Sequence, residues 1–416
     1  MTGAMYAGIA GLKTHMQNLN VIGNNIANIN TDGYKAGRSV FQTALYTQVR
    51  GGSDGSTTVG ARNPAQLGYG VALGTVDIDM STGSYKPTGK TTDCMLDGDG
   101  FLLMGDKTVA GVIDPTQPNT FTALTLSRTG DIEFKSDGYL SNRNGDVVYG
   151  FLTIGTDAEG KPIFSDQLVP IRLPRMESTY ENKDGKPVVT KKNDQTGEME
   201  YFLADDKGEA TGNPLKKEDI VVKKTVRYPT AYKDDDGKPA LPGQKDDQGA
   251  DIEVDAVPLQ DYDDKMPFAE FDTISFDENT GLISGTTKDT GERVVIGMFA
   301  IGNVTNPNGV TQISATQYKA GAGSGDLTIS TLGNAGADVG IEFVNGSLHG
   351  DAELGDAARV NSAGSTALIT GGLEMSKTDL ATEIANMITT QRGYQANTRI
   401  ITVTDSMLEE LVNMKR

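Results

Sequence analysis

The chain has 416 residues, a formal net charge of −19 at pH 7 and a single cysteine, Cys94. This length suits roughly two to four domains, and the acidic balance argues against nucleic-acid and anionic-membrane partners. One cysteine excludes an intramolecular disulfide framework.

The first 30 residues indicate an amphipathic helix. Apolar residues recur at seven-residue intervals on two rows: Met5, Leu12, Leu19 and Ile26, and beside them Ile9, Met16 and Gly23. Such a repeat keeps one stripe facing a partner helix along its whole length. The helix is expected to end near Asn30-Thr31-Asp32-Gly33, a C-cap and turn cluster.

The chain between the two ends is predicted to be β-rich, because short apolar runs alternate with Asp-Gly and Asn-Gly turns. Residues 31–75 and 361–372 are predicted to form an extended, irregular connector. Residues 76–174 and 269–360 are predicted to form an inner β domain. Its expected strands include Phe101 to Met104, Val147 to Ile154 and Val294 to Ile301.

A change of composition marks residues 175–268, which are dense in Lys, Asp and Glu. Strand-like runs persist there at Val188-Val189 and at Ile220 to Val226. We therefore expect a charged, solvated outer β domain and not a disordered segment.

The C-terminal segment from residue 373 to 416 indicates a second, longer helix. Its apolar row is Leu373, Leu380, Met387, Tyr394, Ile401 and Leu408, and its less apolar row is Ile384, Gln391, Thr398, Asp405 and Val412. Ser376 and Asp379 are predicted to form a capping box ahead of this run. Gly393 is its one helix-weakening residue, at a cost of roughly 1 kcal/mol relative to Ala.

Neither terminal helix could bury its stripe alone, so the ends are predicted to form a coiled-coil pair with further copies of the pair around it. Because the ends carry only +1 and −1, residues 31–372 carry the whole net charge of −19. Like-charge repulsion opposes the packing of identical subunits, so the near-neutral ends suit self-association. A two-helix cap on a monomer is the alternative, which the length of the seam disfavours. The expected polymer-core interface is Met5, Ile9, Leu12, Met16, Leu19, Ile26, Leu380, Ile384, Met387, Tyr394, Ile401 and Leu408.

The predicted fold class is mainly β with a terminal α-helical coiled coil. Each inner domain interrupts the one outside it, which gives nested, discontinuous domains in an elongated subunit whose termini lie at one end.

Enzymatic interpretations find little support, and we expect no catalytic, cofactor or metal site. His15 and His349 are the chain's two histidines, and neither has a second histidine nearby in the sequence for a metal site or triad. Cys94 lies in an expected strand and is interpreted as a packed residue. The Gly83 to Thr91 stretch has the wrong glycine spacing for a phosphate loop. The acidic turn that begins at Asp234 lacks the ligand pattern of a calcium loop.

The N-terminus does not indicate a cleavable secretory signal. Residues 2–12 are mildly apolar and Gly-rich, and the nearby cation, Lys13, follows them instead of preceding them. The longest apolar run, Val294 to Ile301, is too short to cross a bilayer. Passage out of the cell would need another export route.

Three stretches resemble one known family. Residues 21–35 read VIGNNIANINTDGYK, residues 90–101 begin KTTD and end GDGF, and residues 387–397 read MITTQRGYQAN after the run LEMS at 373–376. In this order they resemble the N-terminal signature, the start of the first β domain and the shared C-terminal helix of the bacterial flagellar rod and hook proteins. The charged insert has no matching motif, and residues 326–360 are longer than the family's usual return path.

The resemblance implies a tubular helical homopolymer with the terminal helices at its core and the insert on its outer surface. It implies export through the flagellar type III apparatus and a location outside the cell, in the hook and basal body. Length and insert favour a hook subunit, a flexible coupling that passes motor torque to the filament. Its implied partners are its own copies, the distal rod protein, the hook cap and the hook–filament junction protein. A distal rod subunit and an exported fibrous adhesin remain as alternatives.

Overall fold

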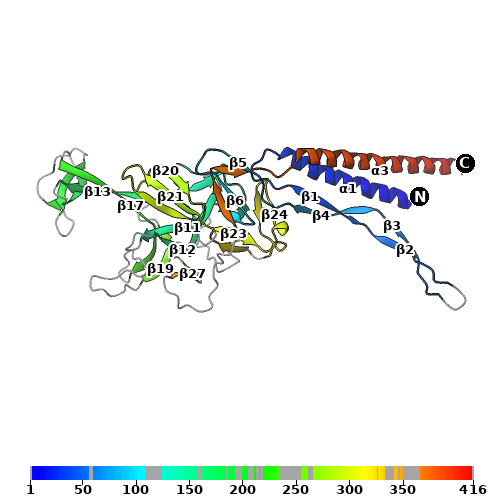
Figure 1. Cartoon of the computed structure of the whole chain (residues 1–416), viewed down its shortest axis with the longest axis horizontal. Helices are drawn as coiled ribbons and strands as arrows, with labels where there is room; N and C mark the ends of the chain where they lie inside the picture. The colour runs from blue at the N-terminus through cyan, green and yellow to red at the C-terminus, as the bar shows by residue number, and fades with distance from the viewer. Residues whose placement is uncertain are drawn as a thin grey trace. The chain divides into compact units, whose positions relative to one another are not determined.

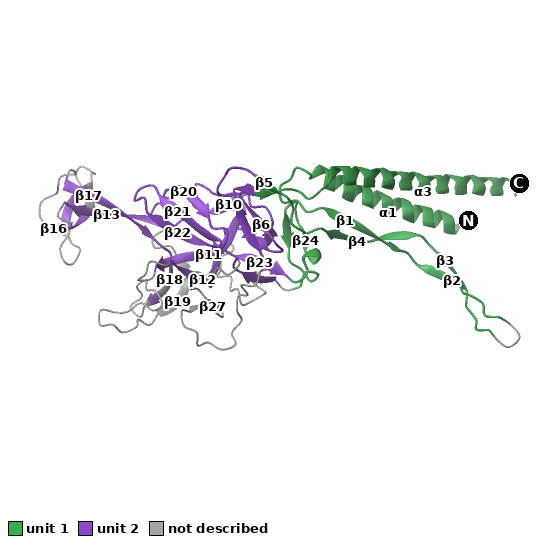
Figure 2. Ribbon diagram, in the orientation of Figure 1, with its two compact units in different colours: residues 1–86, 305–325, 373–416 green, residues 87–304, 326–372 purple. Residues whose placement is uncertain are grey.

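The chain is mainly β with a helix at each end, and it forms two compact units (Figure 2). The computed structural model describes residues 2–55, 60–107, 124–156, 162–183, 186–192, 199–204, 210–211, 215, 219–234, 254–260, 266–325, 327–332, 342–344, 347–349 and 366–414. Unit 1 comprises residues 1–86, 305–325 and 373–416, and unit 2 comprises residues 87–304 and 326–372. The finer division into four nested parts stays a prediction.

The two terminal helices of unit 1 are α1 (Thr2–Ala27) and α3 (Leu380–Met414). They lie side by side and antiparallel, with both chain termini at the same end of the pair (Figure 1). The turn after α1 closes at Gly33, whose φ of 75° is a conformation that glycine adopts without strain. The predicted helix end near Asn30 to Gly33 is confirmed to within a turn.

The N-cap of α3 is Asp379 and not Ser376. The predicted capping box, which placed the cap at Ser376, is therefore wrong. The Asp379 carboxylate accepts hydrogen bonds from the Ala381 amide at 3.1 Å and the Thr382 hydroxyl at 2.5 Å. These bonds hold the pKa of the Asp379 carboxyl below its usual value. Ser376 lies outside the helix, where its hydroxyl accepts from the Thr378 amide at 3.3 Å. An acidic N-cap accepts a hydrogen bond from a free amide of the first turn without help from Ser376.

A long antiparallel ribbon follows α1. Strand β1 (Gly37–Thr43) pairs with β4 (Val71–Ile78), and β2 (Tyr46–Arg50) pairs with β3 (Ala65–Gly68). The irregular structure predicted for residues 31–75 is therefore wrong. A two-stranded ribbon is held by its backbone ladder, so it needs no periodic apolar anchors that the sequence would reveal.

Unit 1 is completed by short elements. They are β5 (Tyr85–Pro87) at its border, η3 (Pro307–Gly309), β24 (Thr311–Gln312), β25 (Gln317–Lys319) and β30 (Gly372–Glu374).

The main sheet of unit 2 is antiparallel and has the strand order β20-β21-β22-β11-β7-β8. Their bounds are β20 (Phe271–Phe276), β21 (Leu282–Thr287), β22 (Arg293–Phe299), β11 (Val147–Thr156), β7 (Phe101–Gly105) and β8 (Thr125–Ser127). Other strands add to it or pair beside it: β6 (Cys94–Asp97), β9 (Ile132–Phe134), β10 (Leu140–Asn142), β12 (Pro162–Pro170), β23 (Ile301–Val304), β26 (Leu327–Ser330) and β29 (Ala367–Thr370). The strands predicted near residues 101, 147 and 294 are confirmed.

The core of unit 2 is formed by fully buried apolar side chains from strands that are far apart in sequence. Leu102, Leu152 and Phe299 belong to one continuous cluster with Cys94. The rings of Phe276 and Phe299 meet edge to face at 5.0 Å.

The charged insert contains a five-stranded antiparallel sheet with the order β16-β15-β14-β13-β17. The bounds are β13 (Arg175–Asn182), β14 (Pro187–Lys192), β15 (Met199–Ala204), β16 (Ala210–Thr211) and β17 (Ile220–Arg227). The insert also contains the pair of β18 (Thr230–Asp234) with β19 (Val254–Gln260). Outside the insert, unit 2 has the pair of β27 (Glu342–Val344) with β28 (Ser347–His349). The strands predicted at Val188 and at Ile220 are confirmed. Three stretches lie outside the described residues: the acidic turn beyond Asp234, most of residues 326–360, and residues 361–365 of the connector.

Candidate assembly interface

The two terminal helices approach each other through glycines on α1. A Cβ placed on Gly8 would lie 3.3 Å from the Ile401 side chain, and one on Gly11 would lie 2.8 Å from Asn397 Nδ2. Small residues let two helix backbones come close, so these positions set the distance between α1 and α3.

Polar side chains fix the register of the same pair. The Asn18 amide donates to the Thr390 hydroxyl at 2.8 Å, and the Asn25 amide donates to Glu383 Oε1 at 3.1 Å. Asn25 is buried and also donates to the Gly37 carbonyl at 2.8 Å, which ties the helix pair to β1. These bonds satisfy polar groups that would otherwise be costly to bury.

The seam inside one chain therefore differs from the predicted apolar rows. Its α1 residues recur at seven-residue intervals, but apart from the buried Ile22 they are small or polar: Gly8, His15 and Ile22 form one row, and Gly11, Asn18 and Asn25 form the other. The signal that would have found them is the heptad spacing of glycine and asparagine. The predicted interface was chosen for apolar side chains, and glycine and asparagine were therefore left out.

Apart from Ile401, which contacts Gly8 in the seam, the predicted interface residues lie beside this seam, and all of them are incompletely covered. Met5, Leu12, Leu19 and Ile26 of α1 and Met387, Tyr394, Ile401 and Leu408 of α3 are half-buried. Ile9, Met16, Leu380 and Ile384 are 45%, 47%, 45% and 44% exposed. The chain brings the helices together but leaves these apolar side chains with exposed surface, and their role in a polymer core stays a prediction.

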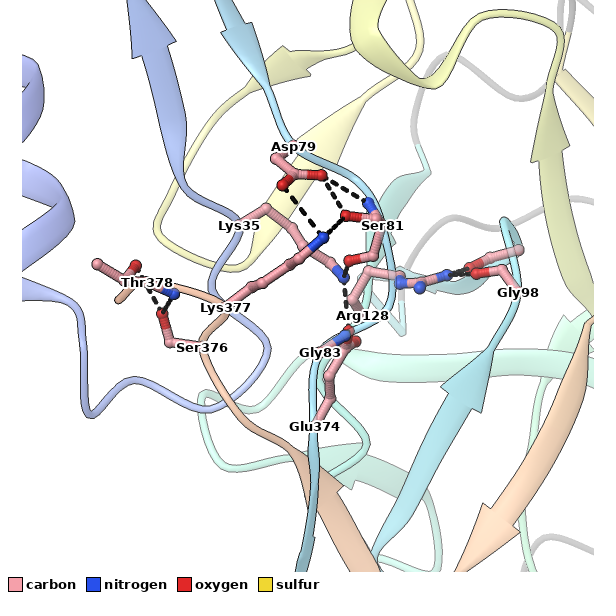
Figure 3. Close-up of polar contacts among 11 residues, drawn as sticks. Lys35, Asp79, Ser81, Gly83, Gly98, Arg128, Glu374, Ser376, Lys377 and Thr378 are labelled. Atoms are coloured by element: carbon pink, nitrogen blue, oxygen red, sulfur yellow. Dashed lines mark hydrogen bonds and ion pairs between the residues drawn. The ribbon is translucent and has the colours of Figure 1, made fainter. Parts of the chain in front are cut away.

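A buried ion pair joins the two ends of the chain next to the helices (Figure 3). Lys35 Nζ donates to Glu374 Oε1 at 2.5 Å and to the Ser81 carbonyl at 2.8 Å, and both charged side chains are 1% exposed. The Gly83 amide donates to the same Glu374 oxygen at 2.6 Å. Three chain segments thus meet at the Glu374 carboxylate. The backbone carbonyl of Glu374 also accepts a hydrogen bond from the Gly33 amide at 2.7 Å.

Tyr34 extends this junction to the end of α1. Its hydroxyl donates to Asn25 Oδ1 at 3.0 Å and accepts from the Asn24 amide at 3.2 Å. Burial, with a smaller contribution from the Glu383 charge, raises the pKa of Tyr34. The junction is therefore built largely from the N-terminal stretch that carries the family resemblance.

A more exposed pair lies beside the junction. Lys377 Nζ lies 3.3 Å from the Asp79 carboxylate, and Ser81 donates to the same carboxylate (Figure 3). Burial alone would raise the pKa of Asp79, but the Ser81 bonds and the Lys377 charge hold it below its usual value.

The described residues offer little for catalysis. Burial, with a smaller contribution from Asp93, raises the pKa of the Cys94 thiol to about 12, so the thiol stays protonated. His15 lies in the helix seam, and His349 lies in β28. Within the described ranges no cluster of three or more His, Cys, Asp and Glu side chains is placed to hold a metal ion. A groove of about 880 Å³ runs beside α1, α3 and β1, and its lining is mixed and mostly polar.

No helix in the described part of the chain is long and apolar enough to cross a membrane.

Two family models match the ends of the chain. The model described as flagella basal body rod protein matches residues 5–35, and the model described as flagellar basal body rod FlgEFG protein C-terminal matches residues 369–414. The matched segments contain the helix seam and the Lys35–Glu374 junction.

Three curated relatives align with nearly the whole chain. The flagellar hook protein FlgE of Borreliella burgdorferi is 27% identical and the flagellar basal-body rod protein FlgG of Bacillus subtilis 28% identical, each over 100% of both chains. The hook protein FlgE of Salmonella typhimurium is 27% identical over 98% of both chains. The crystal structure of Helicobacter pylori flagellar hook protein FlgE2 matches 59% of this chain and 96% of that chain. The sequence identity is 13% and the TM-score is 0.28.

Proposed function

The chain belongs to the family of bacterial flagellar rod and hook proteins, and we propose that it is the structural subunit of the flagellar hook. In this function it polymerises into a flexible tube that passes motor torque to the filament. The hook proteins FlgE that align with nearly the whole chain support this assignment.

The observation that carries the polymer is the uncovered apolar surface of the helix pair. One chain buries a small and polar seam and leaves Ile9, Met16 and Ile384 between 44% and 47% exposed. Burial of apolar surface stabilises association by about 25 cal/mol per Å². Further copies of the pair would cover these residues, and the terminal helices would then line the core of the tube.

The charged insert suits the outer surface of such a tube. Its ion pairs are exposed: Lys183 lies 2.7 Å from Asp219 and Lys223 lies 3.9 Å from Glu181, with side chains between 36% and 63% exposed. Exposed pairs contribute little and are easily exchanged for water. Neighbouring subunits could slide past one another there while the helical core stays joined.

Assembly as a hook implies contacts at both ends of the tube and a route out of the cell. We propose the distal rod protein, the hook cap and the hook–filament junction protein as partners, and the flagellar type III apparatus as the exporter. The location would be outside the cell, in the hook.

A distal rod subunit is the second candidate. The rod protein FlgG of Bacillus subtilis aligns over 421 positions with all 416 residues of this chain, so the two chains have nearly the same length. Rod and hook differ in mechanical behaviour, since a rod is straight and a hook bends.

Electron microscopy of tubes grown from the purified chain distinguishes the two functions. Curved, supercoiling tubes are expected for a hook subunit. Straight, stiff tubes would assign the chain to the rod, and the absence of any tube would contradict both functions.

A further inference from the structure

The end of the β ribbon carries an uncovered apolar surface. This ribbon tip, residues 45–55 and 60–69, contains β2 and β3, and every residue of β2 is exposed. Leu45, Val49 and Leu67 are 81%, 70% and 52% exposed. A two-stranded ribbon is marginally stable in water by itself, so such a surface is expected to be covered in the assembled protein.

The strand register gathers Leu45, Leu67 and Tyr69 on one face, and Val49 lies at a register shift between Gln48 and Arg50. Thr47 lies opposite Leu67, and the Tyr69 amide donates to the Leu45 carbonyl at 3.0 Å. Because side chains alternate along a strand, Leu45, Leu67 and Tyr69 share a face. The other face holds Tyr46, whose ring covers Gly68 so closely that a Cβ there would lie 3.1 Å from it. The same face carries the paired polar residues Gln48 and Gln66, so the face with Leu45, Leu67 and Tyr69 is the more apolar one.

The C-terminal half of α3 carries a second uncovered stripe, which begins at the edge of the seam with α1, where Ile400 Cγ2 would lie 3.6 Å from a Cβ on Gly8. Ile400, Val403, Met407 and Leu411 recur at intervals of three and four residues and are 44%, 53%, 51% and 41% exposed. This spacing places them on one face of the helix. We name these residues the distal stripe.

Charge selects the distal stripe as the match for the ribbon tip. In a chain of net charge −19, the ribbon tip holds Arg50 and Arg62 against Asp54, so it is locally basic. The charges within the distal stripe's own stretch, residues 400–414, are Asp405, Glu409 and Glu410, and the bases Arg399, Lys415 and Arg416 flank it at its two ends. The exposed apolar face of α1 has only Lys13 as a charge, which has the same sign as the ribbon tip. Opposite charges favour the α3 surface and disfavour α1.

We propose that the apolar face of the ribbon tip docks on the distal stripe of a second copy of this chain. Within unit 1 the ribbon tip and the C-terminal half of α3 lie toward the same end (Figure 2). Copies side by side at one level of a tube would therefore bring the two surfaces together. The inference rests on the proposed polymer and adds a specific contact outside the helix pairs.

Cysteine pairing between two different chains tests the contact. Full-length Val49→Cys and Val403→Cys chains are mixed, assembled into tubes and oxidised. The native Cys94 is fully buried, which keeps it out of the reaction. Mixed tubes should give several-fold more disulfide-linked dimer than tubes of either variant alone. A dimer yield in mixed tubes no higher than in the single-variant tubes would overturn the proposal.

A competing pair identifies the surface. Val49→Cys mixed with Ile9→Cys reports docking on α1, and more dimer from that mixture than from the Val403→Cys mixture would overturn the proposal. If the parent chain forms no tubes, the proposed function itself fails. If tubes form without a link between 49 and 403, only this inference fails.

Charge reversal supplies an independent measurement. Arg50→Glu with Arg62→Glu should raise the critical concentration for assembly several-fold, because the ribbon tip would then repel Glu410 beside the distal stripe. Glu410→Arg alone should do the same. The combined variant should assemble nearly as well as the parent. A combined variant that is worse than both would overturn the proposal.

Discussion

The His15 ring lies against the backbone of Gly393, so closely that a Cβ at position 393 would be 2.7 Å from His15 Cε1. This contact explains why a glycine stands in the middle of a helix of 35 residues. The glycine weakens the helix locally, but it lets the imidazole enter the seam between α1 and α3.

Gly393→Ala is expected to destabilise unit 1 despite the better helix propensity of alanine. The gain in propensity is about 1 kcal/mol, whereas overpacking a close contact costs about 1–3 kcal/mol. Thermal unfolding followed by circular dichroism measures the difference. Gly23→Ala is the matched control, since nothing lies within 4 Å of its Cβ position, and it should be stabilising. A stabilising Gly393→Ala would show that His15 moves aside freely.

Replacing one partner of the Lys35–Glu374 pair should destabilise the fold far more than replacing both partners. Lys35→Met alone leaves a buried carboxylate and should cost about 3–5 kcal/mol. The double variant Lys35→Met with Glu374→Leu replaces both charges by apolar groups and should recover most of that loss. Denaturant unfolding of the two variants measures the effect. Equal losses in the single and double variants would contradict an ion pair at this junction.

The charged insert should be removable without unfolding the rest of unit 2. Its two ends are adjacent, because the Met176 amide donates to the Pro267 carbonyl and the Ala269 amide to the Pro174 carbonyl, each at 2.9 Å. Replacing residues 175–268 by a short Gly-Ser bridge should leave a cooperative β-sheet melt and altered tube stiffness. An unfolded remainder would count against an independent insert.

Leu408→Asp should block polymerisation while leaving unit 2 folded. Leu408 is half-buried on the seam side of α3, and an unpaired charge there would recur at every subunit. Burying such a charge costs several kcal/mol. Glu409→Gln, an exposed neighbour, is the control and should sediment as polymer almost like the parent. Normal assembly of Leu408→Asp would remove this residue from the core.

The features with a strong period or turn signal could be predicted from the sequence. The heptad rows of Leu373 to Leu408 located α3, and the Gly-rich turns separated strands such as β7 and β11 correctly. These signals are local, so tertiary packing did not override them.

The helix seam and the ribbon could not be predicted, for two different reasons. The seam depends on Gly8, Gly11 and Asn18, whose importance comes from the backbone approach and hydrogen bonds they permit in three dimensions. The ribbon is set by cross-strand backbone bonds between residues such as Val40 and Thr75, which apolar periodicity does not reveal. The Lys35–Glu374 pair joins residues at opposite ends of the sequence, and no local pattern connects them.

We propose that the apolar residues exposed on a single helix pair become the buried core of a polymer. Ile9 tests it most directly, because it is 45% exposed in the chain and its replacement should not disturb the monomer. The measurement is sedimentation of polymer from purified Ile9→Asp and Ile9→Leu chains, with circular dichroism of the monomers as the check on folding. We expect Ile9→Leu to assemble like the parent and Ile9→Asp to stay soluble with an unchanged monomer spectrum. Polymerisation of Ile9→Asp to the same extent as the parent would contradict the proposal.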